Sequence, residues 1–372
     1  MEKRKILIIN TAPFNLNGIS SMIMNYYSAL DKNILTCDFI INREIDPKYE
    51  RELKLYDGKL YILNRNKNLF LYSLELLKII NRNKYDFVHV HGNSASMIFE
   101  TLPAKLLGVK QIAVHSHNTT CNSIRLHKFL NPLFQHTFNI ALACGEQAGY
   151  WMFGKKKFQV LKNGIEIEKF RFSEQDRQQL RNTIINSEDF VLGHVGAFNP
   201  AKNHTFLIDL FKKVKDRISC AKLVLVGDGR LRNDIEQKIQ KLGLEDSIIL
   251  IGKTPNVEKY LSAFDLFLLP SLFEGFPVTL IEAQASGLNC FVTDNIDVEV
   301  NITGGVNFLK TNEHDIWVNK IISYYRGNYR ENYRENITNR LERSNLYIQK
   351  LEEKGYDKKK SVSIIKDLYE GK

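Results

Sequence analysis

The chain of 372 residues is 44% hydrophobic and 25% charged, which are ordinary values for a globular protein of about two domains. It contains no run of eighteen apolar residues, and the apolar stretch at residues 6–9 is too short for a signal peptide, so we expect a cytoplasmic protein without a membrane-spanning helix. Its five scattered cysteines suggest neither a disulfide framework nor a zinc site. The net charge of +10 lies mostly in residues 1–170, which carry 23 basic and 14 acidic residues. This basic part could contact anionic lipid headgroups or a phosphorylated acceptor. No nucleic-acid-binding motif accompanies the charge, so we rank nucleic acid lower as a partner.

The first part of the chain alternates short β-branched runs with longer amphipathic stretches. Helical patterns occur at residues 69–81 and at residues 95–107, the latter ended by Gly108. This rhythm of strand, helix and strand is typical of a doubly wound parallel sheet. The predicted strands are 6–10, 37–41, 59–63, 86–91, 111–115, 140–143 and 158–161.

The same rhythm restarts after residue 188. Strands are predicted at 190–195, 222–226, 248–251, 266–269 and 290–293, with helices at 205–215, 231–242, 257–263 and 278–285. The polar segment 163–188 has no strand pattern and is a candidate interdomain linker. We expect an α/β protein with two Rossmann-like domains facing a central cleft, with functional residues just after the strands.

The most informative stretch is residues 271–283, which follow the predicted strand at 266–269. Gly275 allows a tight turn, Pro277 suits the first position of a helix, and the free amides at a helix start form an anion site. Glu274 lies in the loop, and Glu282 lies further along the helix, where it could accept hydrogen bonds from ribose hydroxyls. An ordinary amphipathic helix with exposed glutamates explains the pattern about equally well.

Residues 274–282 resemble the signature of the large retaining glycosyltransferase group called family four, which has the GT-B fold. Glu, Gly, Phe and Pro are followed by a second Glu, with seven residues between the two glutamates. Four other segments agree with the family in order, and together the five cover roughly residues 5–310. They are Asn17-Gly18-Ile19-Ser20, Asn163-Gly164-Ile165, Gly196-Ala197-Phe198 with Lys202-Asn203, and Gly227-Asp228-Gly229.

The resemblance implies a division of labour between two domains. Residues 1–165 would bind the acceptor, residues 166–346 would bind the nucleotide sugar, and a helix at about 347–372 would pack back on the first domain. Lys202 would neutralise the donor diphosphate, Glu274 would contact the transferred sugar, and Glu282 would hold the ribose. The implied donor-binding residues are Gly18, Ala197, Lys202, Glu274, Gly275, Phe276, Pro277, Val278, Thr279 and Glu282, with Asn163 as a further candidate.

One departure from the family pattern concerns the diphosphate. Family members usually carry arginine directly after the first glycine of the Gly-x-Phe segment, and this chain has Ala197 there. Arg230, in a neighbouring loop, could supply the missing positive charge. Without such compensation the protein could be a slow enzyme or a catalytically weak nucleotide-sugar-binding partner.

Four histidines form two close pairs, each at the end of a predicted strand. The pairs are His89 with His91 and His115 with His117. Paired histidines could bind a metal, but no carboxylate or cysteine joins them at a recognisable spacing, and the resembled family needs no metal, so none is expected. The resemblance implies that His117, or else His115, contacts the sugar or the acceptor, and His91 is a further candidate. Histidines that bond only to backbone are the alternative.

The resemblance predicts transfer of a sugar, with retention of anomeric configuration, from a nucleotide diphosphate sugar such as a UDP-sugar. The implied acceptor is a polyprenyl-linked glycan in capsule or exopolysaccharide synthesis, which the basic first domain would meet at the inner face of the cell membrane. Other polysaccharide-assembly proteins are further candidate partners. Rival interpretations are a UDP-sugar 2-epimerase of the same fold and a weak nucleotide-sugar-binding subunit. An NAD-dependent oxidoreductase is disfavoured because Arg232 occupies the third glycine position of its motif.

Overall fold

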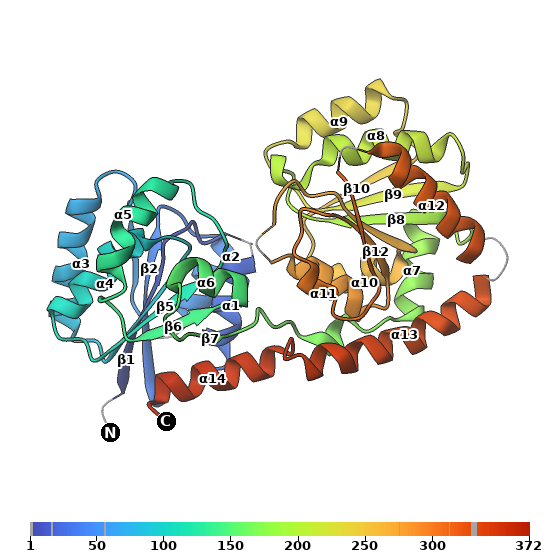
Figure 1. Ribbon diagram of the computed structural model, residues 1–372. Coiled ribbons are helices and arrows are strands. Elements are labelled where there is room, and N and C mark those ends of the chain that lie inside the picture. The colour runs from blue at the N-terminus through green and yellow to red at the C-terminus, as the bar shows by residue number, and fades with distance from the viewer. Residues whose placement is uncertain (1–2, 16–17, 56, 275, 312, 329–332) are drawn as a thin grey trace. The chain divides into compact units, whose positions relative to one another are not determined.

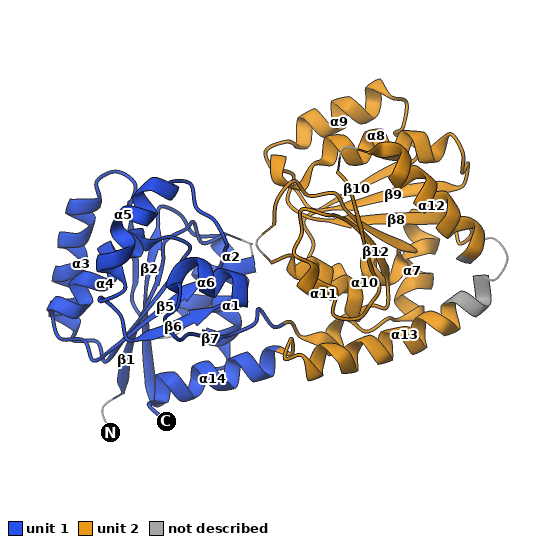
Figure 2. Cartoon of the chain, viewed as in Figure 1, with its two compact units in different colours: residues 1–164, 358–372 blue, residues 165–357 orange. Residues whose placement is uncertain are grey.

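Two compact units make up the computed structural model (Figure 1). Residues 1–164 and 358–372 form unit 1, and residues 165–357 form unit 2 (Figure 2). The structure describes residues 3–15, 18–55, 57–274, 276–311, 313–328 and 333–372. The last fifteen residues therefore belong to the same unit as the first strand.

The sheet of unit 1 is parallel throughout its described part. Its strands are β1 (Arg4–Asn10), β2 (Leu35–Asn42), β3 (Leu60–Leu63), β4 (Phe87–Gly92), β5 (Gln111–Ser116), β6 (Ile140–Ala143) and β7 (Gln159–Val160). Their spatial order is β3-β2-β1-β4-β5-β6-β7. The order reverses between β1 and β4, and in doubly wound sheets ligands bind beyond the carboxyl ends of the strands at this switch point.

Helices cover both faces of this sheet, which explains why its central strands are buried on both sides. One face packs against α1 (Gly18–Ser28), α2 (Pro47–Lys54) and α14 (Lys358–Glu370), whose Ile365 and Tyr369 are fully buried there. The other face packs against α3 (Leu69–Asn83), α4 (Ile98–Leu106), α5 (Ile124–Phe134) and α6 (Glu146–Phe153).

Unit 2 contains a second parallel sheet. Its strands are β8 (Phe190–Val195), β9 (Ala221–Val226), β10 (Ile248–Gly252), β11 (Leu266–Leu269), β12 (Asn289–Thr293) and β13 (Val306–Leu309), in the spatial order β10-β9-β8-β11-β12-β13. The switch point lies between β8 and β11. The short strand β13, with only two of its four residues buried, was not predicted from the sequence.

The faces of the second sheet bury two separate clusters. Phe190 and Leu192 point to a cluster with α8 (His204–Lys215), α9 (Arg232–Lys241) and α12 (His314–Asn328). Val191 and Val195 point to the opposite cluster with α10 (Val257–Ala263), α11 (Val278–Ala285) and α13 (Tyr333–Glu353). Successive residues of a strand face opposite sides of a sheet, so both clusters are built from the same apolar runs.

The interpretation of residues 163–188 as a linker was wrong for most of the segment. It contains a 3-10 turn, Ile167–Phe170, and helix α7 (Glu174–Ile184), which packs against α10 in unit 2. The buried residues of α7 are Arg177 and Arg181, which form ion pairs of 2.5 Å with the two carboxylate oxygens of Asp265. Hydrophobic periodicity misses a helix whose buried face is made of arginines.

Candidate functional site

Two loops meet at the switch point of unit 2. One follows β8 and contains residues 196–203, and the other follows β11 and contains residues 270–277. The amide of Leu272 donates a hydrogen bond of 2.8 Å to the carbonyl of Ala201, and the side-chain amide of Asn203 donates one of 3.2 Å to the carbonyl of Pro270. These bonds hold the two loops together beside the start of α11.

Lys202 and Glu274, one from each loop, form an ion pair. Lys202 Nζ lies 2.5 Å from Glu274 Oε1, and the two side chains are only 15% and 13% exposed. The hydroxyl of Ser271 donates a 2.7 Å hydrogen bond to the same carboxylate oxygen, and Asn199 caps the short turn that carries Lys202. Ser271 and Asn199 were not singled out from the sequence, although each lies three residues before the residue that it positions.

Glycines allow the neighbouring loops to approach this pair. A Cβ at Gly196 would lie 3.1 Å from the Cδ and Cε atoms of Lys202, so the lysine stem passes directly over Gly196. Gly227 has a φ of +140°, and a Cβ there would lie 2.0 Å from the carbonyl oxygen of Gly196. The motifs at 196–198 and 227–229 therefore share one packed loop cluster, in which only glycine fits.

Helix α11 begins beside the ion pair. Pro277 immediately precedes it as the N-cap residue, one position earlier than expected, and Val278 and Thr279 form its first turn. The first amides of a helix have no partner within the helix and attract anions. The hydroxyl of Thr279 is also buried without a hydrogen-bond partner. The start of α11 thus offers several donors to one anionic group.

Glu282 lies one turn further along α11. Desolvation raises the pKa of its carboxyl group to about 7, while the charges of Lys169 and Lys202 act in the opposite direction. Such a carboxyl group can both donate and accept hydrogen bonds near neutral pH. Phe276 stacks instead on Tyr356, with ring centroids 5.5 Å apart, and packs at the edge of the hydrophobic cluster. Gly275 lies outside the described residues.

Two residues near this site concern the arginine that family members usually carry: Ala197, which stands in its place, and Arg230, which could compensate for it. Ala197 is exposed at the end of β8, and Arg230 is exposed in the loop after β9. Phe198 connects these loops, because its amide donates to the carbonyl of Asp228 and its carbonyl accepts from the amide of Leu231. Arg230 is therefore attached to the loop that carries Ala197, as a compensating cation would need to be.

Loops that follow strands of unit 1 contain two other predicted residues. Gly18 is exposed and begins α1, so its loop precedes a helix start, while Asn17 lies outside the described residues. Asn163 follows β7 and is buried, and its side-chain oxygen has no hydrogen-bond partner. Gly18 and Asn163 are thus at loops after strands, but the structure gives no contact between them.

The four paired histidines come together in one buried cluster on unit 1. The register of β4 and β5 places His91 opposite His115, and His91 Nδ1 lies 3.1 Å from His117 Nε2. His89 Nδ1 lies 2.7 Å from the hydroxyl of Tyr369 on α14. Burial lowers the pKa of His89 and of His117 to about 3, and it holds the pKa of His91 and of His115 well below the usual value. All four rings are therefore neutral at pH 7.

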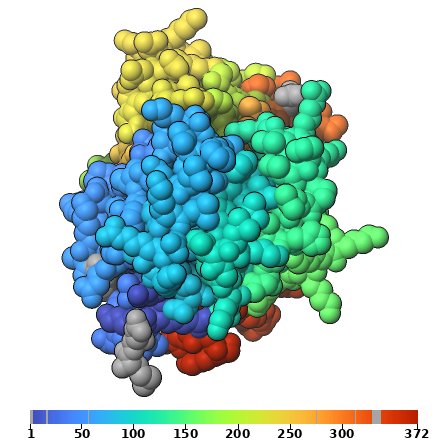
Figure 3. Space-filling view, turned by 90° about the vertical axis from the view of Figure 1, so that its left-hand side faces the viewer, coloured from blue at the N-terminus to red at the C-terminus, as the bar shows by residue number. Residues whose placement is uncertain are grey.

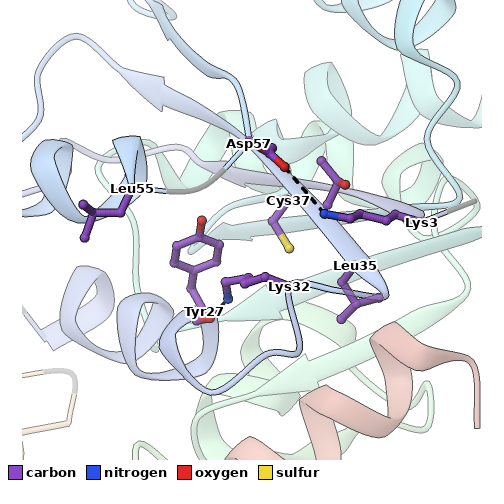
Figure 4. Close-up of a pocket in the computed structure, with 9 residues that line it drawn as sticks. Lys3, Tyr27, Lys32, Leu35, Cys37, Leu55 and Asp57 are labelled. Carbon is purple, nitrogen blue, oxygen red and sulfur yellow. Dashed lines mark hydrogen bonds and ion pairs between the residues drawn. The ribbon is translucent and has the colours of Figure 1, made fainter.

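A pocket of about 130 Å³ lies at the opposite edge of the same sheet (Figure 4). Lys3, Lys32, Cys37 and Asp57 line it near the amino ends of β1 and β2, and Lys3 Nζ lies 3.6 Å from an Asp57 oxygen. Ligands of doubly wound sheets bind at the carboxyl ends of strands, so this pocket is not the candidate site.

The chain is similar to known glycosyltransferases over most of its length. The family model described as glycosyl transferases group 1 matches residues 175–340. EpsF of Bacillus subtilis (strain 168), whose name assigns it to the glycosyltransferases, is 32% identical over 304 residues, which cover 77% of this chain and 78% of EpsF. The chain belongs to the group 1 glycosyltransferases, and its two parallel-sheet domains have the GT-B fold.

A second relative is similar to part of the chain, and one solved structure supports the fold. The UDP-Gal:alpha-D-GlcNAc-diphosphoundecaprenol alpha-1,3-galactosyltransferase of Escherichia coli is 30% identical over 259 residues, covering 65% of this chain and 64% of the relative. The crystal structure of HepE from Anabaena in complex with UDP superposes with a TM-score of 0.76, at 16% identity, over 99% of this chain and all of HepE. At that identity the likeness concerns the fold.

Proposed function

We propose that this protein transfers a sugar, with retention of anomeric configuration, from a UDP-sugar to a polyprenyl-diphosphate-linked glycan in capsule or exopolysaccharide synthesis. The Lys202–Glu274 ion pair beside the start of α11 is the observation that carries the proposal. The name of the Escherichia coli relative includes a UDP-sugar and a diphosphoundecaprenol acceptor, and the HepE structure contains UDP, which supports both choices.

The donor diphosphate would take the place of Glu274 at Lys202. A diphosphate carries more charge than one carboxylate, and the amides and the hydroxyl at the start of α11 add donors that Glu274 cannot use. Displacement would release Glu274 to contact the sugar. Binding of the diphosphate at Lys202 would thereby free the Glu274 carboxylate to orient the sugar ring.

Bond cleavage at the anomeric carbon develops positive charge on the sugar and negative charge on the leaving phosphate. Lys202 and the start of α11 would stabilise the leaving diphosphate, and the fixed orientation of these groups makes such stabilisation effective. With Glu274 and Glu282 assigned to donor binding, we favour attack from the same face of the sugar, with the departing phosphate oxygen taking the acceptor proton. His117 of unit 1 is the candidate for contacting the sugar or acceptor hydroxyl.

Calorimetric titration of UDP tests the donor site. We expect binding without metal, unchanged by magnesium, and at least about tenfold weaker in Lys202→Ala and in Glu282→Ala, which corresponds to about 1.4 kcal/mol. Lys222→Ala is the matched control, because Lys222 is the second residue of β9, at the opposite edge of the sheet, and bonds only to the carbonyl of Asp246 in the described structure. Undiminished UDP binding by both site variants would refute the assignment.

Product analysis tests the reaction itself. Incubation with UDP-sugars and a polyprenyl-diphosphate-linked acceptor should give a product whose anomeric proton coupling in NMR spectra matches that of the donor. UDP binding without any transfer or donor hydrolysis would instead identify a nucleotide-sugar-binding partner, the function that Ala197 suggests.

We also propose that unit 1 contacts the membrane through the flank formed by α3, α4 and α5, which lie side by side in Figure 3. In the described residues no helix is long and apolar enough to cross a bilayer. This flank nevertheless exposes large apolar side chains, including Phe129 (81% exposed), Phe70 (70%) and Leu106 (69%). Singly exposed apolar residues are common, but exposed apolar side chains on three neighbouring helices support an interaction surface.

The sequence of α5 suits an anionic lipid surface. Leu126, Phe129 and Leu133 are exposed at helical spacing along one face, and Arg125 and Lys128 lie beside them. Apolar side chains that enter the headgroup region, together with flanking cations, are typical of interfacial helices. The surface would hold the protein where a lipid-linked acceptor is found.

A further inference from the structure

In the histidine cluster of unit 1, some ring nitrogens have a hydrogen-bond partner and others do not. His89 and His91 each use Nδ1, toward the hydroxyl of Tyr369 and toward His117 respectively. The Nε2 atoms of His89 and His91 therefore remain for a second interaction. His115 packs beside both rings, with its ring centroid 5.8 Å from that of His89 and 5.4 Å from that of His91.

Several nitrogen atoms of the cluster are buried without a partner. They are Nε2 of His89, both ring nitrogens of His115 and Nδ1 of His117. The rings of His89 and His115 have no exposed surface. A buried polar atom without a hydrogen bond costs about 1–3 kcal/mol, so a group of them in one place requires an explanation such as an ordered water or an ion.

We propose that His89, His91 and His115 bind a divalent transition-metal ion, with zinc as the expected ion. Ligand nitrogens of the three rings lie within 4.8 Å of one another. Three neutral imidazoles are a ligand set that zinc accepts, and they leave a fourth position open. All three proposed ligands belong to unit 1, whereas Lys202, Glu274 and Glu282 belong to unit 2.

The surroundings of two of the three rings, His89 and His91, match those of known metal-binding histidines. Such histidines usually bind the metal with one nitrogen and hold a hydrogen-bond partner with the other, which fixes the ring. Tyr369 supplies that partner for His89, and His117 supplies it for His91. Asn10, which pairs with His91 in the sheet register, has a buried side-chain oxygen without a partner and is the candidate for the fourth position.

Coordination requires only a small adjustment of the rings. Nitrogens around a tetrahedral zinc stand about 3.3 Å apart, given a zinc–nitrogen distance of about 2.0–2.1 Å. The sequence argued against a metal because no carboxylate or cysteine joins the two histidine pairs at a recognisable spacing. The parallel register of β4 and β5 joins the pairs, since it places His91 opposite His115 and His89 two residues before.

Cobalt titration of the untagged, chelator-treated full chain tests the site. We expect the visible absorption bands of four-coordinate cobalt, saturating at about one equivalent and displaced by zinc. The bands should be lost in His89→Leu and in His115→Leu, while Tyr369→Phe should keep them and weaken affinity about tenfold. His127→Ala is the control, because His127 is also buried in unit 1 but stacks on Trp151 outside the cluster.

Two measurements keep the test decisive if a leucine variant fails to fold. X-ray absorption of the zinc-loaded wild type should show three imidazoles, and zinc should raise the melting temperature of the wild type. Absence of cobalt bands in the wild type, or bands that persist in folded His115→Leu, would overturn the proposal and leave ordered water as the partner of these nitrogens. Either result leaves UDP binding by unit 2 unaffected.

Discussion

Glu282 combines a raised pKa with a proposed role that needs its ionised form. Desolvation brings its pKa to about 7, so at neutral pH the free protein holds a mixture of protonated and ionised carboxyl groups. Hydrogen bonds from ribose hydroxyls favour the carboxylate and lower its pKa. UDP binding should therefore release a proton, and affinity should fall as the pH drops below 7.

Calorimetry in buffers of different ionisation enthalpy measures this proton release directly. Glu282→Gln keeps the shape of the side chain and removes the titration, so its UDP affinity should depend less on pH between 6 and 8. UDP itself also titrates near pH 6, and the variant corrects for that contribution. Equal pH dependence in wild type and variant would show that Glu282 does not bind the ribose in its charged form.

At the residue scale, motif spacing indicated the charged residues of the candidate site but not the neighbouring side chains that position them. The sequence indicated Lys202 and Glu274 because each occupies a motif position after a strand, and the structure brings the two into contact. It could not reveal that Ser271 positions Glu274 or that three histidines converge, since such contacts depend on sheet register and loop conformation. The sequence shows that Ala197 replaces an arginine, but it does not show that hydrogen bonds of Phe198 join the Arg230 loop to the Ala197 loop.

At the scale of single elements, the docking of α7 depends on one buried carboxylate. Asp265 pairs with both Arg177 and Arg181, and its pKa is held below the usual value chiefly because these arginines outweigh its desolvation. Removing one partner of a buried ion pair typically costs about 3–5 kcal/mol, because the remaining charge stays buried. Asp265→Ala should therefore destabilise unit 2 by about that amount.

Tryptophan fluorescence during urea unfolding can detect this loss in unit 2 alone. The chain has two tryptophans, Trp151 in unit 1 and Trp317 in the core of unit 2, so the comparison is made in a Trp151→Phe background. Asp315→Ala, which removes an exposed ion pair with Lys213, is the matched control and should leave the unfolding midpoint nearly unchanged. Equal midpoints for the two variants would mean that α7 is not held by its arginines.

Elements with strong apolar runs were predicted well, and the others were not. Eleven of the twelve predicted strands need only small changes at their ends, and the twelfth, at 158–161, shortens to Gln159–Val160. The strand β13 and the helix α7 were missed because one is short and half-buried and the other buries arginines. Periodicity detects burial of apolar side chains, and it fails wherever polar groups are buried with partners.

At the scale of the whole molecule, the exposed apolar flank of α3, α4 and α5 predicts membrane association. The wild type should co-sediment with vesicles containing phosphatidylglycerol and much less with vesicles of phosphatidylcholine alone. The pair of substitutions Phe129→Ser and Leu133→Ser should abolish association with either composition, and Arg125→Glu with Lys128→Glu should remove the preference for anionic lipid.

Leu346→Ser provides the control for this experiment, because Leu346 is also half exposed but lies on α13 in unit 2. Co-sedimentation that does not change in the α5 variants would refute a membrane contact through this flank. UDP binding should be equal in all these variants, which separates the membrane surface from the donor site.

The fold as a whole followed from the repeated alternation of strands and helices, together with five motifs in a fixed order. Alternation requires parallel sheets with helices on both faces, and the restart of the pattern requires two of them. The division of the chain into units depends on contacts of α14, which composition does not reveal.

Ile365 and Tyr369 complete the core of the unit that contains β1, so unit 1 gains these core residues only after all of unit 2 has been made. Domains usually fold in the order of their synthesis, but unit 2 has all its residues before α14 is made. During translation the sheet face that α14 covers stays open, and His89 lacks the Tyr369 hydroxyl as its partner, until α14 emerges. The hydrogen bond between His89 and Tyr369 therefore forms only after the strands of both sheets have been synthesised.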